Sequence, residues 1–114
     1  GCTGNFKIGL NEVAIGVTMH NAGIEIARNR IPVNYLTRAV INAELFAPET
    51  AITAGFLDHI VEEDQLMITA QAVAKQMLSL NLTAHHGTKL KERQSILASL
   101  DTAIAIDAKS TINL

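Results

Sequence analysis

Glu12 is the residue of this chain with the clearest potential for chemistry. It stands at the end of a short apolar run, with Ile8 and Leu10 before it and Val13 and Ile15 after it. A carboxyl group that is buried without a partner is costly to ionise, so it tends to hold a proton that it can give up near neutral pH. A general acid or base requires this property. The alternative is a carboxylate at a strand end that lies in water or on a helix N-terminus.

The other residues that could take part in chemistry are weaker candidates. His20 follows Glu12 closely and either reaches a ligand in the same pocket or faces water. Asp58 and His59 are better explained as polar residues at a strand end than as catalytic groups. The sequence contains neither a glycine-rich phosphate loop nor a nucleophile elbow. Glu12 therefore remains the main candidate.

No metal site is predicted. His85 and His86 are adjacent, so on a helix their side chains point about 100° apart and form a poor chelate. No cysteine or carboxylate follows them at the spacing of metal ligands. We interpret them as a pair of surface histidines.

The elements that must position Glu12 and His20 begin with one or two short strands over residues 5–16. Thr18 can cap a helix over residues 19–29. Pro32 suits the first turn of a second helix, which covers residues 33–41.

The middle of the chain is predicted to contain a helix, a strand and the start of another helix. Pro48 opens the helix, and Gly55 closes it in the left-handed conformation. Residues 56–61 are predicted to form a strand. The acidic residues 62–64 then favour the positive end of a new helix dipole.

The rest of the chain is predicted to be helical. Asn81 can end the helix that the acidic residues open, and a last helical region covers residues 83–109 with a break near residues 94–95. The first of these helices carries one apolar stripe, formed by Leu66, Ala70, Val73, Met77 and Leu80.

Composition limits the class of protein. The chain has 114 residues and a net charge of −2, which argues against a nucleic-acid partner. Lys89, Lys91 and Arg93 have Glu92 among them and are predicted to form the solvated face of a helix. The single cysteine, Cys2, excludes an internal disulfide and fits a reducing compartment, so we expect a cytoplasmic protein.

The high apolar content predicts a partner surface. Hydrophobic residues make up 48% of the chain and charged residues only 18%, which is apolar for a small domain. No run of eighteen apolar residues is present, so no membrane span is predicted. The chain starts with Gly1 and lacks an initiator methionine and a signal peptide, so we expect it to begin partway through a longer protein.

Several segments in order resemble the crotonase (enoyl-CoA hydratase/isomerase) superfamily. Residues 6–16 are similar to the family segment that carries the catalytic glutamate, with Asn11-Glu12 where Pro-Glu is commoner. The sequence Ile8-Gly9-Leu10-Asn11-Glu12 is similar to that of 3,2-trans-enoyl-CoA isomerases. The resemblance continues through residues 38–41, 46–51, 54–61, the helix from Glu63 and residues 84–93.

The resemblance implies an α/β crotonase-like (ClpP/crotonase spiral) fold, of which this chain is the C-terminal half. Residues 1–61 would form the end of the ββα core, and residues 62–114 a helical oligomerisation region. The implied partners are the missing N-terminal half of the same protein and further copies of it in a homotrimer or hexamer.

The resemblance also implies a reaction. Glu12 would move a proton next to the carbonyl of a coenzyme A thioester, which is the substrate, so that no cofactor is needed. Gly16 and His20 would contact the substrate. Hydratases usually have Pro-Gly where this chain has Met19-His20, which favours double-bond isomerisation over hydration. The alternative is a non-catalytic helical module for oligomerisation or interaction.

Overall fold

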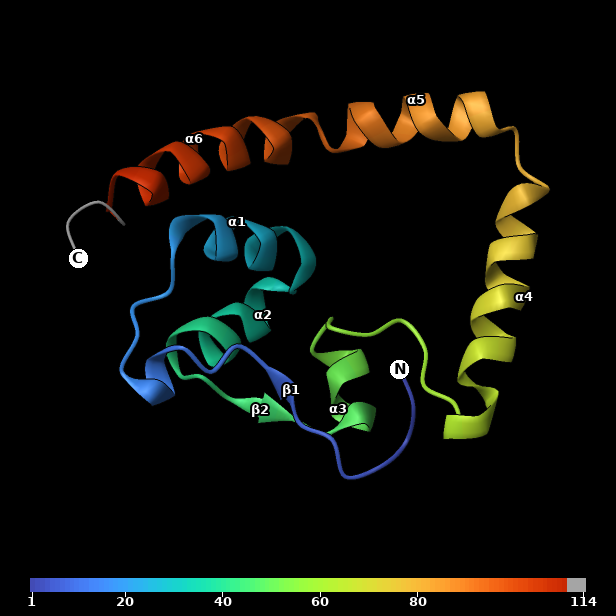
Figure 1. Cartoon of the computed structure of the whole chain (residues 1–114), viewed down its shortest axis with the longest axis horizontal. Coiled ribbons are helices and arrows are strands. Elements are labelled where there is room, and N and C mark those ends of the chain that lie inside the picture. Colours follow the sequence, from blue (N-terminus) through green and yellow to red (C-terminus); the bar gives the residue numbers. More distant parts are fainter. Residues whose placement is uncertain (111–114) are drawn as a thin grey trace.

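The first half of the chain forms a short antiparallel sheet and several short helices, and three longer helices follow (Figure 1). The computed structural model describes residues 1–110. The elements are β1 (Ile8–Gly9), η1 (Val13–Ile15), α1 (Asn21–Arg30), α2 (Val33–Leu36), η2 (Thr37–Ile41), β2 (Leu45–Phe46), α3 (Pro48–Thr53), η3 (Glu63–Gln65), α4 (Leu66–Leu78), α5 (Leu82–Glu92) and α6 (Gln94–Ser110).

The predicted strand region over residues 5–16 is only partly a strand. β1 and β2 pair antiparallel, with Ile8 opposite Phe46 and Gly9 opposite Leu45. After β1 the chain turns into the 3-10 helix η1 and does not continue as a strand. The turn at Glu12 is therefore helical.

The core lies between the sheet and helices α1, α2 and α3. Phe46 is at its centre, 3% exposed, with its ring 6.0 Å from that of Tyr35 and 5.7 Å from that of Phe56. The small side chains of Ala39, Ala51 and Ala54 are fully buried and let the helices pack closely around this ring. The other buried members of this cluster are Met19, Ala27, Ile31 and Val40.

Three of the predicted helices are present, with corrections at their ends. α1 starts two residues later than predicted, and its N-cap is His20 and not Thr18, because Met19 is buried in the core and the helix begins only after it. The predicted helix over residues 33–41 is confirmed, although its second half, η2, is a π-helix. The helix opened by Pro48 is also confirmed, and Gly55 has the predicted positive φ of 93°.

The strand predicted over residues 56–61 is wrong. The backbone N–H groups of Phe56 and Leu57 donate to the carbonyl oxygen of Ala51, at 2.9 and 3.3 Å, and so tie the segment to the end of α3. Its only strand-like contact among residues 1–110 is an isolated parallel bridge between Cys2 and Val61.

The second half of the chain forms a helical arm, which we define as residues 63–110. α4 ends at Leu78, so Leu80 of the predicted stripe lies beyond it, and Asn81 caps the start of α5 and does not end α4. The predicted break lies at Arg93, between α5 and α6. α6 lies along α1, whereas α4 and α5 stand apart from the core helices (Figure 1).

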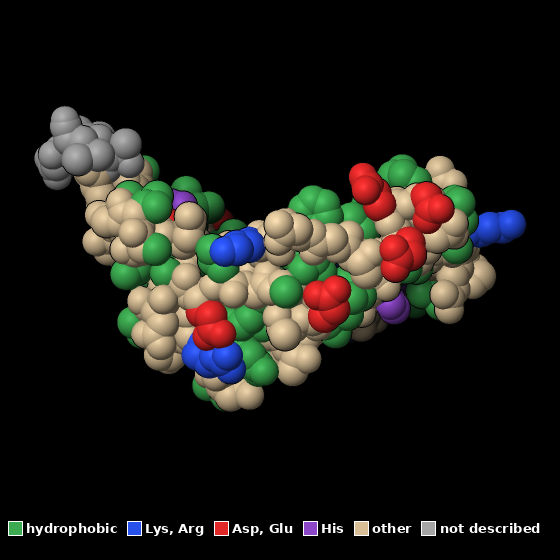
Figure 2. Space-filling view, turned by 90° about the horizontal axis from the view of Figure 1, so that it is seen from below, with side chains coloured by type: hydrophobic (Ala, Val, Ile, Leu, Met, Phe, Trp, Pro, Cys, Tyr) green, Lys and Arg blue, Asp and Glu red, His purple; other side chains and the backbone are tan. Residues whose placement is uncertain are grey.

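This arm gives the described chain an open shape. Its radius of gyration is 16.9 Å, whereas a compact domain of this length has about 13 Å. Large apolar side chains are exposed along the arm, and Figure 2 shows exposed hydrophobic side chains among charged ones on one face of the molecule. The most exposed of them are Met67, Ile68, Leu78, Leu82 and Ile104.

Candidate active site

Glu12 lies on a tight turn directly after the sheet. Its backbone carbonyl oxygen accepts hydrogen bonds from the N–H groups of Ile15 (3.1 Å) and Val17 (2.8 Å). Gly16 closes the turn with a φ of 79°, and its N–H donates to the carbonyl oxygen of Val13 at 3.1 Å. The turn fixes the backbone of Glu12 between the sheet and the segment that leads into α1.

The carboxyl group of Glu12 has an unusual environment. Its atom Oε2 is buried and has no hydrogen-bond partner among residues 1–110. Val13 and Ile15 were expected to lie on a strand and to shield the carboxyl group from water. They lie in η1 instead and are 49% and 66% exposed. The predicted strand therefore does not extend as far as Glu12, whereas a buried carboxyl oxygen is present. An unsatisfied buried polar atom in a native fold calls for an explanation, and a catalytic role is one of those available.

Gly16 ends the turn, and His20 precedes α1, so the two residues bound the short segment that joins the turn to this helix. A Cβ atom at Gly16 would meet no other atom within 4 Å, so the residue borders open space and its visible role is the left-handed turn. His20 is exposed, and its Nδ1 accepts a hydrogen bond from the N–H of Gly23 at 3.0 Å. No hydrogen bond joins His20 to Glu12 within the described residues.

Asp107 had no signal in the sequence and reaches the start of α1, next to His20, from α6. Its Oδ1 accepts hydrogen bonds from the N–H and the Nδ2 group of Asn21, at 2.9 and 2.8 Å, and its Oδ2 accepts one from the N–H of Ala22 at 2.8 Å. We call these hydrogen bonds the Asp107 contact. They lower the pKa of Asp107, the bond from Ala22 most, and His20 adds a small effect in the same direction.

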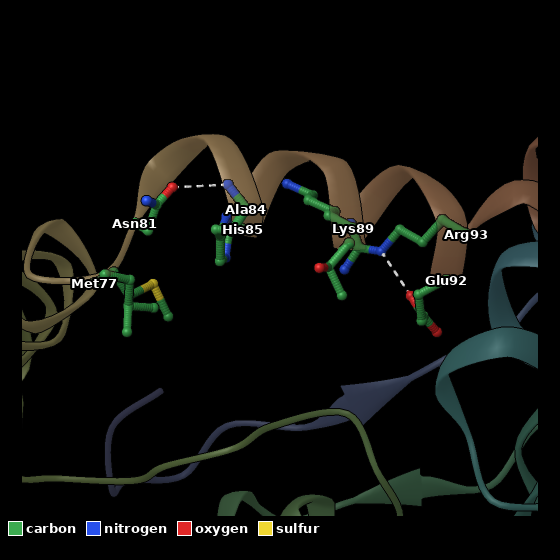
Figure 3. A pocket seen from close by; sticks show the side chains of 9 residues that line it. Met77, Asn81, Ala84, His85, Lys89, Glu92 and Arg93 are labelled. Atoms are coloured by element: carbon green, nitrogen blue, oxygen red, sulfur yellow. Dashed lines mark hydrogen bonds and ion pairs between the residues drawn. The ribbon is translucent and has the colours of Figure 1, made fainter.

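The remaining polar candidates, Asp58 and His85, lie far from Glu12 in the sequence and contact other residues. Asp58 pairs with Arg30 at 2.9 Å, and this hydrogen bond lowers the pKa of Asp58. The exposed His85 lines a hollow of about 680 Å³ on the inner side of α5, together with Met77 and Lys89 (Figure 3). Within residues 1–110, no group of three or more His, Cys, Asp or Glu side chains is placed to hold a metal ion.

Solved structures identify the fold. The described chain matches an enoyl-CoA hydratase/isomerase family protein from Pseudomonas syringae with a TM-score of 0.94 and 52% identity, over 96% of this chain and 47% of that one. The small sheet, the short core helices and the long terminal helices are thus part of a crotonase-like fold, as predicted.

Sequence comparison identifies the family. The model for Enoyl-CoA hydratase/isomerase matches residues 2–112. Human mitochondrial enoyl-CoA delta isomerase 1 is 27% identical over 108 residues, and short-chain-enoyl-CoA hydratase from Clostridium acetobutylicum is 23% identical over 106 residues. The chain belongs to the enoyl-CoA hydratase/isomerase family.

These relatives are longer than this chain. The match covers 95% of the chain but 36% of the human isomerase, and 93% of the chain but 41% of the Clostridium hydratase. The chain therefore spans less than half the length of the curated relatives that it matches. Each of its helices within residues 1–110 is too short or too polar to cross a bilayer.

Proposed function

We propose that the full-length protein containing this chain processes acyl-CoA thioesters and that Glu12 transfers the proton. The observation that supports this role is the buried, unpartnered Oε2 atom of Glu12 on a turn whose backbone is held by two hydrogen bonds. Membership of the enoyl-CoA hydratase/isomerase family supports the substrate class.

In this mechanism the Glu12 carboxylate takes a proton from the carbon next to the thioester carbonyl. The electron pair of the broken C–H bond forms an enolate, with negative charge on the thioester oxygen. The double bond then shifts toward the carbonyl as the carboxyl group returns the proton two carbons further along the acyl chain. Because the reaction moves a proton and no net electrons, coenzyme A enters only as part of the substrate and no cofactor is required.

The enolate oxygen needs hydrogen-bond donors, and we assign no residue of this chain to that role. Preorganised donors of this kind are worth about 3 kcal/mol each. We propose that they come from a part of the full-length protein that this chain does not include, because the chain spans less than half of the length of its curated relatives. The chain alone is therefore expected to be inactive or nearly so.

His20 supports isomerisation over hydration. Because its Nδ1 accepts a hydrogen bond from Gly23, the proton of the neutral imidazole is on Nε2, which is left to donate. A glycine at this position would leave room for an attacking water molecule, whereas the imidazole fills space and offers its own N–H. We propose that His20 and Gly16 border the bound substrate.

The test of the proton-transfer role is Glu12→Gln in the full-length protein, with Glu63→Gln as the control. Glu63 is exposed in η3, at the start of the helical arm. Turnover of a 3-enoyl-CoA should fall at least about a hundredfold for Glu12→Gln, because general acid/base groups commonly contribute that much. The control should stay near the parent activity. If Glu12→Gln retains activity within a few-fold of the parent while remaining folded, Glu12 is not the catalytic group.

The type of reaction is tested by comparing two substrates. The full-length protein is incubated separately with a 3-enoyl-CoA and a 2-enoyl-CoA. We expect faster conversion of the 3-enoyl substrate to its 2-enoyl product. Faster hydration of the 2-enoyl substrate to a 3-hydroxy product would show that the protein is a hydratase and leave the role of Glu12 intact.

The exposed apolar side chains of the helical arm favour a second function, oligomerisation. Leu78 is 69% exposed at the end of α4, and Leu82 is 55% exposed at the start of α5. Burying such side chains gains about 25 cal/mol per Å² of apolar surface. We propose that the full-length protein forms a trimer or a dimer of trimers, with the helical arm in the subunit contact.

This second function is tested by sedimentation of the full-length protein at micromolar concentration. Leu78→Glu places a charge on the exposed apolar surface, and Gln76→Glu adds the same charge elsewhere on α4 as a control. Leu78→Glu should lower the oligomeric state and Gln76→Glu should not. A parent protein that sediments as a stable monomer would contradict the assembly.

A further inference from the structure

The Asp107 contact joins the last described helix to the beginning of the first. The N–H groups in the first turn of a helix have no partner within that helix, and the positive end of the helix dipole attracts a carboxylate. Asp107 satisfies the N–H groups of Asn21 and Ala22 at 2.9 and 2.8 Å. Its carboxyl group has a lowered pKa and is therefore charged at neutral pH.

Two side chains from distant parts of the sequence share the start of α1. His20 accepts from the N–H of Gly23, and Asp107 accepts from those of Asn21 and Ala22. Three successive N–H groups are thus satisfied, one by the residue that precedes the helix and two by α6. Asp107, near the other end of the described chain, therefore holds the backbone that directly follows His20.

The start of α1 is also one end of the segment that carries Glu12. At the other end, the N–H of Val17 donates to the carbonyl oxygen of Glu12 at 2.8 Å. Between these ends Thr18 is exposed and Met19 is buried in the core. The segment is therefore fixed by its turn, by one buried side chain and by the helix start that Asp107 holds.

We propose that Asp107 is a positioning residue for the active site. By holding the first turn of α1, it sets the place of His20 and, through residues 12–20, the direction of the Glu12 carboxyl group. This proposal rests on the proposed function for its catalytic consequence. It predicts that turnover depends on α6, although Asp107 binds the backbone at the start of α1 and not the substrate.

A second aspartate on α6 offers a matched control. Asp101 lies on the same helix, is exposed, and its side chain makes no hydrogen bond or ion pair within the described residues. Asp101→Asn removes the same charge from α6 without touching α1. Asp107→Asn keeps one oxygen acceptor but turns an NH₂ group toward an N–H group of α1, and Asp107→Ala removes both acceptors.

The experiment measures kcat and KM of these variants in the full-length protein with a 3-enoyl-CoA. Asp107→Ala should lower kcat at least about tenfold with KM within a few-fold, because small misplacements of a catalytic group cost rate more than binding. The kcat of Asp107→Asn should lie between that of Asp107→Ala and that of the parent. Asp101→Asn should match the parent. An Asp107→Ala variant that folds and keeps kcat within twofold of the parent would overturn the proposal.

Amide hydrogen exchange gives a readout independent of turnover. In Asp107→Asn, the N–H groups of Asn21 and Ala22 should exchange at least about tenfold faster, and so should those of Ile15 and Val17, which bond to Glu12. Faster exchange at Asn21 and Ala22 alone would reduce Asp107 to a local cap and overturn the positioning role. If Glu12→Gln keeps full activity, the proposed function fails, and the exchange at Ile15 and Val17 still decides the proposal on Asp107.

Discussion

Two glycines that both have a positive φ should respond differently to alanine. Gly16 and Gly55 have φ values of 79° and 93°, in the left-handed region that side chains disfavour. A Cβ at Gly16 would meet no atom within 4 Å. A Cβ at Gly55 would lie 2.6 Å from Cδ of Pro32 and 3.2 Å from the carbonyl oxygen of Arg30.

The expected free energies follow from these surroundings. Gly16→Ala should carry only the backbone cost of the left-handed conformation, about 1–2 kcal/mol. Gly55→Ala should carry that cost and a second one for the contact with Pro32, whose ring is closed into the backbone and cannot rotate away. Overpacking of this kind costs about 1–3 kcal/mol. The total for Gly55→Ala is therefore about 2–5 kcal/mol.

The assay is urea unfolding of the full-length protein and both variants, with the midpoint and slope measured for each. Gly55→Ala should unfold at clearly lower urea than Gly16→Ala. Turnover of Gly16→Ala gives a second result, because an added methyl group in open space reduces activity only if Gly16 borders the substrate. Equal destabilisation by the two substitutions would refute the reasoning from the space around each Cβ.

Three other predictions concern the core, a helix cap and acid stability. Phe46→Ala should lower the free energy of unfolding by about 3–5 kcal/mol in urea, whereas Val33→Ala, at a side chain 86% exposed, should change it by less than about 0.5 kcal/mol; similar losses would contradict the assigned core. Asn81→Ala removes the side-chain acceptor for the N–H of Ala84 and should cost about 1 kcal/mol, measured in the same way, and no loss would contradict the cap. The hydrogen bond from Arg30 lowers the pKa of Asp58, so this carboxylate stabilises the fold above the ordinary value of 3.8 and stops doing so as the pH falls through the lowered value. Thermal unfolding should therefore show Asp58→Asn less stable than the parent at pH 7 and the difference shrinking below pH 3.8, and a difference that grows on acidification would contradict this sign.

Local sequence signals predicted much of the secondary structure. Pro48 and Gly55 marked a helix and its end because their backbone preferences act within one or two residues. Residues 56–61 had the composition of a strand but formed none, because the end of α3 holds the N–H groups of Phe56 and Leu57. Composition does not reveal that competing acceptor.

The candidate site was predictable to a smaller extent. The apolar neighbours of Glu12 correctly suggested a buried carboxyl oxygen. The predicted strand was too long, since only Ile8–Gly9 form β1 and η1 leaves Val13 and Ile15 exposed. Asp107 could not be found from the sequence, because its partners are fixed only when α6 packs on α1. Its aspartate character alone does not distinguish it from Asp101 on the same helix.

The Asp107 contact also has a consequence for the order and rate of folding. It joins residues 86 and 85 positions apart, so closing it costs the entropy of a long loop of chain. The turn at Glu12 and helix α3 involve much closer residues and can form earlier. A contact that forms after the rate-limiting step contributes little to the speed of folding and slows unfolding. Loss of the Asp107 carboxylate should therefore shorten the lifetime of the folded protein and expose α6 to proteases, while refolding proceeds at nearly the parent rate.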